Sequence, residues 1–412
     1  SSGTSIGHYQ MLQHTRSLQT ARSTQITAHA SKQALSRPAT SVVSASDPNA
    51  IRITFKAGWR TGVVHGSLAG APWKDYDMEA TGGAHRCTLS ITSDQAQALS
   101  TGATFEFVLN NTEGSWEKGT DGGNFSINKP GNFLVKDGRT QPVSPGPAVM
   151  VVSDLDGTMV GDDSATSAFR QWWDSTALPR GGILVYNTGR SLESFEGLAR
   201  DKAHCLARPD VLISAVGTKV YELQHGQWVE DAGWTSALDQ GWELGAARDA
   251  CYRALAQVGK ELMHFRPANE QNGHKVTCGI AVSAIQTVLD AVGTELSAKG
   301  VQHQCITSGH GDWRFLDLVP QNAGKLAALD YVRQQYGFAL HATVACGDSG
   351  NDILMLQGEN LAIVVSNAQP DLKEWYETQP AGTGPEGKSR LLMTSKAEAY
   401  GILEGLAYWG LQ

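Results

Sequence analysis

A proline-rich segment divides this 412-residue chain into two stretches with different hydrophobic patterns. Three prolines lie in TQPVSPGPA (140–148), which has little helix or strand character. Before it, short alternating runs such as IRITF (51–55) and TFEFVLNN (104–111) are bounded by Gly, Asn and Pro, and they predict a β-sandwich over residues 49–138. We therefore expect residues 139–148 to be a linker between two domains.

Beyond this linker, apolar runs alternate with amphipathic stretches, a pattern that predicts a parallel sheet covered by helices on both faces. The apolar runs are VMVVSDL (149–155), ILVYNTG (183–189), VLISAVG (211–217), TVACGDS (343–349) and LAIVVSN (361–367). Helical patterns at 239–262 and 283–299 predict an inserted α/β cap over about residues 219–310. The sequence thus predicts an α/β domain over residues 149–412.

Charge and hydropathy limit the partners of the chain. Its 41 acidic and 33 basic residues give a net charge of −8, which argues against a protein that binds nucleic-acid backbones. No apolar run approaches about 18 residues, so we expect no membrane-spanning helix. The six cysteines lack C-x-x-C spacing, which favours reduced thiols. We expect neither nucleic acid nor a membrane as a partner.

Residues 1–46 contain no Asp or Glu, and their few basic residues are scattered among Ser, Thr, Gln and Ala. This composition is typical of an organelle transit peptide and favours a chloroplast or other plastid. A disordered tail on a cytoplasmic protein is the alternative.

The strongest functional signal is a set of polar residues where the apolar runs end or a helical stretch begins. Ligands of parallel sheets bind beyond the carboxyl ends of the strands, and carboxylates gathered there require a cation. The set is Asp154, Asp156, Thr188, Lys325, Asp348 and Asp352. A carboxylate nucleophile, a second carboxyl group, a hydroxyl, an ammonium and acidic metal ligands together suit phosphoryl transfer.

Each catalytic candidate has an expected role. Asp154 would attack phosphorus and form an aspartyl phosphate, while Asp156 would protonate the leaving oxygen and later activate water. Thr188 and Lys325 would hold phosphate oxygens. The expected Mg²⁺ ligands are Asp154, the backbone carbonyl of Asp156, Asp348 and Asp352. Asp352 could instead only cap its helix.

These ordered motifs resemble the haloacid dehalogenase superfamily of phosphatases over about residues 149–412. The closer resemblance is to the sucrose-6-phosphate phosphatase family, on SDLDGTMV, YNTGRS (186–191), SAVGT (214–218), GHKV (273–276) and ACGDSGND. It implies an α/β fold in which a Rossmann-like parallel sheet carries an inserted α/β cap, here preceded by the all-β sandwich. It also implies an Mg²⁺-dependent phosphatase, with sucrose 6-phosphate the favoured substrate. TSGHGDWRFLDLVPQ (307–321) departs from the family pattern, which leaves the sugar open.

The resemblance also implies that the cap contacts the sugar through a Gln-x-x-His-Lys segment, which matches Gln271, His274 and Lys275. A solvated turn before a strand is the alternative for this segment. The other expected substrate-binding residues are Thr158, Gly189, Arg190 and Asn351.

The predicted sandwich carries aromatic residues on turn-rich segments, where flat rings can bind sugar faces. The phrase FVLNNTEGSWEKGTDGGNF (107–125) resembles starch-binding carbohydrate-binding modules of family 25. That resemblance implies an α-glucan or starch partner and a binding face of His65, Trp73, Trp116, Asn110 and Asn111. Core packing of the tryptophans is the alternative.

Two other functions stay open. The chain could be a phosphatase for another phosphosugar or for phosphoglucan, since a starch-binding sandwich would bring the site to that polymer. It could also be a non-catalytic glucan-binding regulator, although every catalytic position is filled.

Overall fold

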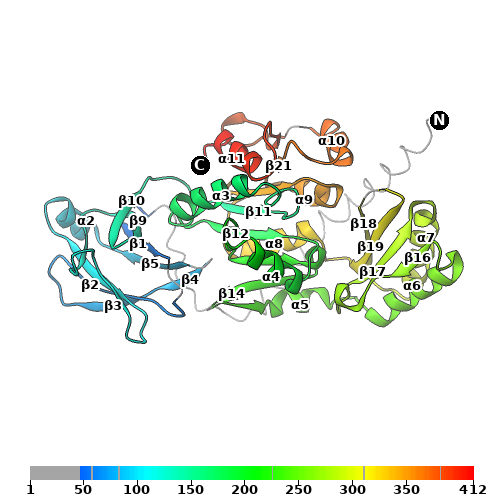
Figure 1. Cartoon of the computed structure of the whole chain (residues 1–412), viewed down its shortest axis with the longest axis horizontal. Coiled ribbons are helices and arrows are strands. Elements are labelled where there is room, and N and C mark those ends of the chain that lie inside the picture. Colours follow the sequence, from blue (N-terminus) through cyan, green and yellow to red (C-terminus); the bar gives the residue numbers. More distant parts are fainter. Residues whose placement is uncertain (1–46, 57–58, 82–83, 225, 310, 381) are drawn as a thin grey trace.

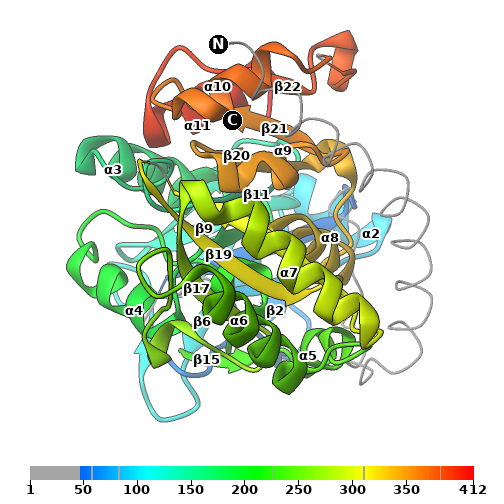
Figure 2. The same cartoon turned by 90° about the vertical axis from the view of Figure 1, so that its right-hand side faces the viewer.

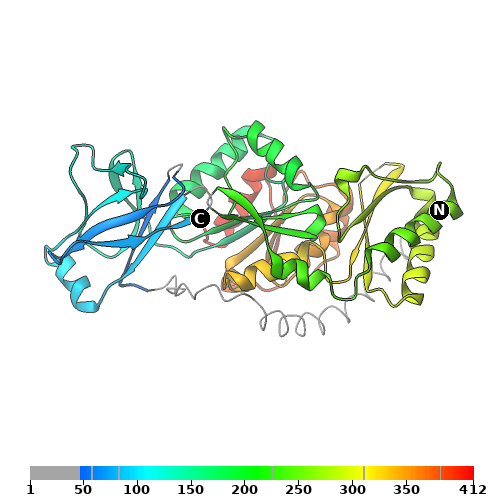
Figure 3. The same cartoon turned by 90° about the horizontal axis from the view of Figure 1, so that it is seen from below.

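The computed structural model describes residues 47–56, 59–81, 84–224, 226–309, 311–380 and 382–412, so the expected leader (1–46) lies outside the described residues. The described chain forms three bodies in a row, with a sandwich at one end, a mixed sheet flanked by helices in the middle and a cap at the other end (Figures 1 and 3). Within the described part of the chain, no helix combines the length and apolar character needed to cross a bilayer. All six cysteines are free thiols, as their spacing predicts.

The N-terminal body consists of two β-sheets. The first has the order β10-β9-β1-β5-β4, formed by β1 (Ala50–Phe55), β4 (Glu79–Thr81), β5 (Ala84–Ser90), β9 (Gly131–Lys136) and β10 (Arg139–Val143). The second has the order β3-β2-β6-β7, formed by β2 (Val63–Leu68), β3 (Lys74–Asp77), β6 (Phe105–Asn110) and β7 (Trp116–Glu117), and β8 (Phe125–Ile127) also pairs with β6. Inward-facing residues of both sheets, such as Ile53 and Phe107, form one core, as alternation along each strand requires.

The expected linker, residues 139–148, is corrected in its first half. Strand β10 pairs antiparallel with β9 from Arg139 to Val143, so the sandwich continues past residue 138. Pro142 is tolerated because β10 is an edge strand, where a missing backbone donor costs little. The carbonyl of Ser144, in the shorter connection that follows, accepts a hydrogen bond from Arg180 Nε at 3.0 Å.

The central body is built on an eight-stranded sheet with the order β15-β14-β13-β12-β11-β20-β21-β22. Its strands are β11 (Met150–Ser153), β12 (Ile183–Asn187), β13 (Val211–Ser214), β14 (Lys219–Gln224), β15 (Gln227–Glu230), β20 (Thr343–Gly347), β21 (Leu361–Val364) and β22 (Leu391–Met393). Neighbouring strands pair in parallel except at one edge, where β14 pairs antiparallel with both β13 and β15. The sheet is therefore mixed, whereas the sequence pattern predicts a parallel one.

Helices cover both faces of this sheet because successive strand residues alternate between two apolar cores. One face packs against α3 (Asp163–Trp172), the π-helical η1 (Trp173–Ala177), α4 (Leu192–Asp201) and α11 (Glu398–Tyr408). The other packs against α5 (Ala232–Leu238), α8 (Lys325–Gln335), α9 (Ile353–Leu356) and α10 (Pro370–Glu377). Val151 points to the first set and Val152 to the second.

The cap is a four-stranded antiparallel sheet with the order β16-β17-β19-β18. Its strands are β16 (Met263–Phe265), β17 (Val276–Ala281), β18 (His303–Ser308) and β19 (Trp313–Pro320). Helices α6 (Leu244–Val258) and α7 (Ile285–Ala298) cover one face, and Figure 2 shows them in front of β17 and β19.

The expected cap boundaries, about 219–310, need correction at both ends. At the first end, β14 and β15 belong to the central sheet because β14 pairs with β13 from Val211 to Ser214. At the other end, β19 belongs to the cap because it pairs with both β17 and β18. The cap sheet and its two helices therefore span Leu244 to Pro320.

Candidate active site

The candidate catalytic residues gather at one edge of the central sheet. Strands β12, β11 and β20 are neighbours and parallel, so their carboxyl ends lie side by side. Asp154 follows β11, Thr188 follows β12 and Asp348 follows β20. The amide of Asp154 donates to the carbonyl of Cys346 at 3.0 Å, which joins the first and third of these strand ends.

Lys325 lies at the centre of the cluster. It is the first residue of α8, and its side chain is 1% exposed. Its Nζ donates to Asp154 Oδ1 at 2.8 Å and to Asp352 Oδ1 at 2.7 Å, and lies 3.5 Å from Asn351 Oδ1. Asp352 Oδ2 accepts from the backbone amide of Asp348 at 3.1 Å. Two carboxylates from distant parts of the sequence are thus held by one ammonium group.

Burial perturbs the titration of this cluster. Desolvation raises the pKa of Asp154 to about 7, because the effects of burial, Asp352 and Asp348 outweigh the opposing charge of Lys325. Desolvation, with Asp352 next, raises the pKa of Asp348 to about 6. Burial alone would lower the pKa of Lys325, but the adjacent carboxylates raise it. Three buried carboxylates therefore share a single positive charge.

The donor set fits a hard divalent cation. Asp154, Asp348 and Asp352 are buried, and each offers a carboxylate oxygen within 4.8 Å of the others. Oxygen ligands with excess negative charge are what Mg²⁺ prefers, and a cation would relieve the cost of burying these carboxylates together. Asp156, expected to contribute only its backbone carbonyl, follows Asp154 by two residues in the same loop.

The loop after β11 is shaped to bring Thr158 against this cluster. Thr158 Oγ1 donates to Asp348 Oδ1 at 2.8 Å. Gly157 has φ +80°, and a Cβ there would lie 2.6 Å from Asp348 Oδ2, so this position requires glycine. Asn367, which lies just after β21, donates through Nδ2 to the carbonyl of Gly157 at 2.7 Å. This hydrogen bond fixes the turn.

Asp156 and Arg190 form a second group beside the first. Arg190 donates through Nε and a terminal nitrogen to the two oxygens of Asp156, both at 2.7 Å. Asp156 is 54% exposed, unlike the buried Asp154. The amide of Arg190 donates to Oγ1 of the buried Thr188 at 3.2 Å, and Gly189 between them is exposed. A proton-transfer group accessible to solvent thus lies next to the shielded nucleophile candidate.

Of the three expected cap residues, Gln271 and Lys275 have partners within the cap, whereas His274 pairs with Asp239 at the end of α5. Both polar atoms of the Gln271 side-chain amide form hydrogen bonds with the backbone of Thr277. Nε2 donates to its carbonyl at 2.8 Å, and Oε1 accepts from its amide at 2.7 Å. His274 Nε2 lies 2.7 Å from Asp239 Oδ1, and Lys275 Nζ lies 3.5 Å from Asp317 Oδ1. Gln271 therefore shapes its loop here, whereas its expected role is a sugar contact.

Sequence reasoning missed several residues of this region. Ser349 donates through Oγ to Asn351 Oδ1 at 2.9 Å, and Asn367 fixes the loop of Gly157. Asp317 is a buried carboxylate facing Lys275 and Thr277. Asn367 ends the run LAIVVSN, so the same strand-end signal that identified Asp154 applies to it.

A separate aromatic group lies on the second sheet of the sandwich. The rings of His65 and Trp73 stack with centroids 5.2 Å apart, and Trp116 meets His65 edge-on at 6.3 Å. Trp73 is 41% exposed and Trp116 is 52% exposed, so neither is a core tryptophan. Asp75 Oδ1 lies 2.6 Å from His65 Nδ1 and orients that ring.

The two asparagines expected on this face serve the adjoining turn. Asn110 Oδ1 accepts from the amide of Thr112, and Asn111 Oδ1 accepts from the amide of Ser115 at 2.8 Å. Asn111 is also buried. Its side-chain oxygen therefore positions the segment before Trp116, and its expected contact with glucan stays a prediction.

Known proteins are similar to the part of this chain that forms the central body and the cap. Residues 147–410 match the family described as sucrose-6F-phosphate phosphohydrolase. The chain is 32% identical over 274 residues to probable sucrose-phosphatase 2 of Arabidopsis thaliana, covering 64% of this chain and 60% of that protein. It is 28% identical over 266 residues to mannosylfructose-phosphate phosphatase of Agrobacterium fabrum, covering 64% of this chain and 98% of that protein.

A solved structure is similar to about the same share of the chain. The sucrose-phosphatase of Synechocystis sp. in complex with sucrose and phosphate is 30% identical, with a TM-score of 0.52, and the match covers 64% of this chain and 98% of that one. The chain spans about 60% of the length of the plant relative. The family match begins at residue 147, after the sandwich.

These matches confirm the expected enzyme class of the family, the phosphoric monoester hydrolases, and the expected α/β phosphatase fold. Because the family match covers well over half of the chain and contains the whole cluster around Lys325, the chain belongs to the sucrose-6F-phosphate phosphohydrolase family of the haloacid dehalogenase superfamily.

Proposed function

We propose that the chain is an Mg²⁺-dependent phosphatase that hydrolyses a phosphorylated disaccharide, with sucrose 6-phosphate as the first candidate. The observation that carries this proposal is the Lys325 cluster, in which an ammonium group joins Asp154 to Asp352 beside Asp348. When bound by these carboxylates, Mg²⁺ would supply positive charge between the nucleophile and the phosphate.

The residues divide the reaction into two steps. A carboxylate oxygen of Asp154 forms a bond to phosphorus while the bond from phosphorus to the sugar oxygen breaks, and Asp156 donates the proton that this oxygen needs. Asp156 then takes a proton from water, which attacks the phosphorus and frees Asp154 and phosphate. Lys325 holds Asp154 in position throughout. Its positive charge stabilises the negative charges of the attacking carboxylate and of the phosphate oxygens.

Arg190 suits recognition of the phosphate group at the rim. Its guanidinium already presents two parallel donors to Asp156 at 2.7 Å each, the geometry that also fits phosphate oxygens. The names of the relatives favour a disaccharide phosphate, because one is a probable sucrose-phosphatase and another a mannosylfructose-phosphate phosphatase. Mannosylfructose phosphate is therefore the second candidate substrate.

A phosphate-release screen tests the proposal. The substrates are sucrose 6-phosphate, mannosylfructose phosphate, trehalose 6-phosphate, glucose 6-phosphate and solubilised phosphoglucan, each with Mg²⁺ or EDTA. We expect the highest kcat/KM for a disaccharide phosphate and no turnover in EDTA. Preference for phosphoglucan would favour the polymer phosphatase, and no turnover of any substrate would favour the non-catalytic regulator.

We further propose that the sandwich binds α-glucan through His65, Trp73 and Trp116. Two tryptophans more than 40% exposed, held in fixed relation by a stacked histidine, give a rigid apolar platform for sugar rings. Binding to starch granules by the full-length Trp116→Ala variant should weaken by about 1–3 kcal/mol, or about 5- to 150-fold in Kd. Trp313→Ala is the matched control, because Trp313 is also 41% exposed but lies in the cap. Equal losses in both variants would contradict a specific glucan face.

A further inference from the structure

The face of the cap sheet that its helices leave open carries exposed aromatic side chains. Helices α6 and α7 cover the other face, where Cys278 and Leu316 belong to the buried core of the cap. His264, Trp313 and Phe315 project to the open face, because successive strand residues alternate between the two faces. Trp313 is 41% exposed and Phe315 is 42% exposed. Large aromatic rings on one face of a sheet therefore meet solvent.

The strand register brings these three side chains together. Phe315 of β19 lies opposite Gly279 of β17, and Gly279 lies opposite His264 of β16. A Cβ on Gly279 would lie 2.5 Å from His264 Cε1, so the missing side chain leaves room for the imidazole ring. The rings of His264 and Trp313 have centroids 5.1 Å apart. We call His264, Trp313 and Phe315 the aromatic platform.

The ring of Phe315 is held in place by a charged neighbour. The guanidinium carbon of Arg266 lies over this ring, 5.2 Å from its centroid. Glu270 fixes Arg266 in turn, accepting from Nε at 2.9 Å and from a terminal nitrogen at 2.7 Å. A ring that is already fixed loses little conformational freedom when a ligand packs against it. The exposed part of Phe315 is therefore a preorganised binding surface.

The open face leads from the platform to the catalytic centre. Val319 lies four residues after Phe315 on β19, so it projects to the same face, and it belongs to a core of the central body. By the register of β18 and β19, Ile306 also projects to this face, and it packs against that core. Strand β18 further contacts η6 (Gly350–Asp352), which carries one carboxylate of the Lys325 cluster. At about 3.3 Å per residue, Phe315 lies about 13 Å beyond Val319.

The cap spans the strand ends of the candidate active site. Asn272 Nδ2 donates to Thr218 Oγ1 at 3.0 Å, and Thr218 lies in the connection that follows β13. The other contact, with η6, lies after β20. In the order β13-β12-β11-β20, these contacts lie on either side of the strands that precede Thr188 and Asp154. In Figure 1, β17, β18 and β19 lie on the side of the cap next to the central body, and α6 and α7 lie on the far side.

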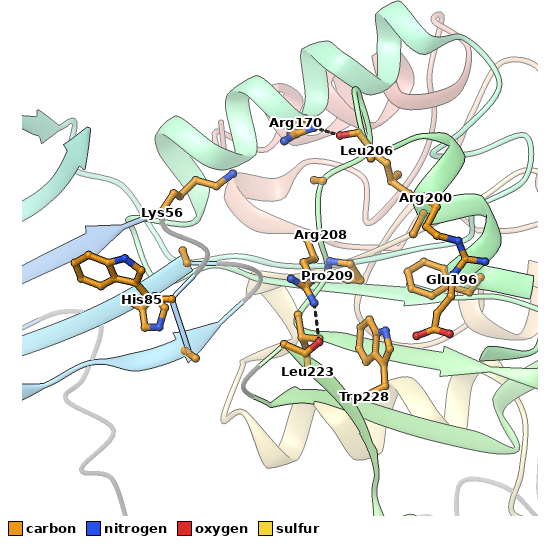
Figure 4. A pocket seen from close by; sticks show the side chains of 18 of the residues that line it. Lys56, His85, Arg170, Glu196, Arg200, Leu206, Arg208, Pro209, Leu223 and Trp228 are labelled. Carbon is orange, nitrogen blue, oxygen red and sulfur yellow. Dashed lines mark hydrogen bonds between the residues drawn. The ribbon is translucent and has the colours of Figure 1, made fainter. Parts of the chain in front are cut away.

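A cavity of about 680 Å³ between the sandwich and the central body belongs to a different part of the molecule. Figure 4 shows Lys56 and Trp228 on opposite sides of it. None of its described lining residues belongs to the Lys325 cluster or to the cap. A sugar whose phosphate lies at Asp154 therefore meets the open face of the cap and not this cavity.

We propose that the aromatic platform packs against the second sugar ring of a phosphorylated disaccharide, the ring that carries no phosphate. This inference rests on the proposed function and adds the residues that select for that ring. The apolar face of a sugar can pack flat on an aromatic ring, and a monosaccharide phosphate lacks the second ring. Trp313 and Phe315 lie in the segment 307–321, where the sequence departs from the family pattern. This means of selection is therefore a feature of this chain.

The test measures two quantities on the full chain with Mg²⁺. One is kcat/KM for the preferred disaccharide phosphate, and the other is Ki for fructose 6-phosphate as a competing ligand, which reports on the phosphate site without the second ring. Phe315→Leu removes a ring but keeps apolar bulk, and Trp313→Ala removes the other large ring. Both should lower kcat/KM by about fivefold or more, while Ki for fructose 6-phosphate stays at its wild-type value.

Two variants are controls. Phe315→Tyr keeps the flat ring and should keep the wild-type kcat/KM. Tyr252→Ala removes an aromatic residue that is 58% exposed and pairs with Phe265, but on helix α6 of the covered face, so it should have no effect. Trp313→Ala stays the control for starch granules, because the platform receives a sugar that is held by its phosphate at Asp154.

Four results would overturn the inference: wild-type kcat/KM in both platform variants, an equal loss in Tyr252→Ala, equal losses in Phe315→Leu and Phe315→Tyr, or a proportional rise in Ki for fructose 6-phosphate. The last result would make the rings part of the fold or of the phosphate site. If Phe315→Leu fails to fold, Trp313→Ala decides alone. A wild type that hydrolyses no disaccharide phosphate would remove the proposed function and the platform together, whereas an active wild type matched by both platform variants would remove the platform alone.

Discussion

Replacing Lys325 with methionine tests the electrostatic account of the catalytic cluster most directly. The ammonium group is 2.8 Å from Asp154 and 2.7 Å from Asp352, and all three side chains are at most 8% exposed. Removing one partner of a buried ion pair leaves uncompensated charge and costs about 3–5 kcal/mol. For a domain of this size, that corresponds to a fall in Tm of roughly 6–20 °C, at about 2–4 °C per kcal/mol.

The loss should depend on pH with a definite sign. The folded pKa of Asp154 is about 7, above the ordinary value of 3.8, and the charge of Lys325 already lowers it. Without that charge, the folded pKa rises further, so ionising Asp154 at pH 8 destabilises the fold relative to the unfolded chain. At pH 5.5 the folded protein keeps this proton. The penalty of the substitution should therefore be larger at pH 8 than at pH 5.5.

Thermal unfolding of the catalytic domain in EDTA, followed by near-ultraviolet circular dichroism at both pH values, measures this difference. Lys299→Met is the control, because Lys299 forms an exposed pair with Glu295 at 2.9 Å and such pairs contribute about 0–1 kcal/mol. A penalty in Lys325→Met that is equal at pH 5.5 and 8, or no larger than in Lys299→Met, would refute the account.

Three further predictions concern catalysis and metal binding. Asp154→Asn should keep the fold but lower kcat by more than about 100-fold in a phosphate-release assay, because the amide cannot form the aspartyl phosphate; a smaller loss would exclude the covalent route. Mg²⁺ affinity measured by calorimetry should fall from pH 8 to pH 5.5, since Asp154 and Asp348, with pKa values of about 7 and 6, must lose protons to bind it; a constant affinity would place the metal elsewhere. Lys275→Ala should lower kcat/KM for sucrose 6-phosphate more than for p-nitrophenyl phosphate, because Lys275 belongs to the cap; equal losses would make it a residue of the fold or the phosphate site.

The sequence predicts the strand-end residues of the site because their signal is local. Asp154, Thr188 and Asp348 each follow an apolar run, and parallel strands bring such ends together whatever the rest of the chain does. Lys325 has no such run before it. It enters the expected set as the first residue of a helical stretch, and the structure joins it to Asp154 by a hydrogen bond.

Elements whose partners lie far away in sequence are harder to predict. The expected cap ends at about residue 310, but β17 and β18 pair on both sides with strand β19 (Trp313–Pro320). Strand β10 contains Pro142, and proline argues against a strand except at a sheet edge. Only the tertiary fold shows that β10 is an edge strand. The bonding of Gln271 to Thr277 likewise depends on the path of its loop.

The cap and Lys325 are joined by a short segment of backbone. Strand β19 leaves the cap at Pro320, and Lys325 begins α8 five residues later. Gly324 between them has φ +115°, which favours glycine, and a Cβ on Gly217 would lie 2.3 Å from its carbonyl carbon. This close packing fixes the end of the segment next to Lys325. Any closing movement of the cap over a sugar must therefore be absorbed before Gly324, so that sugar recognition can change while the contact between Lys325 and Asp154 stays in place.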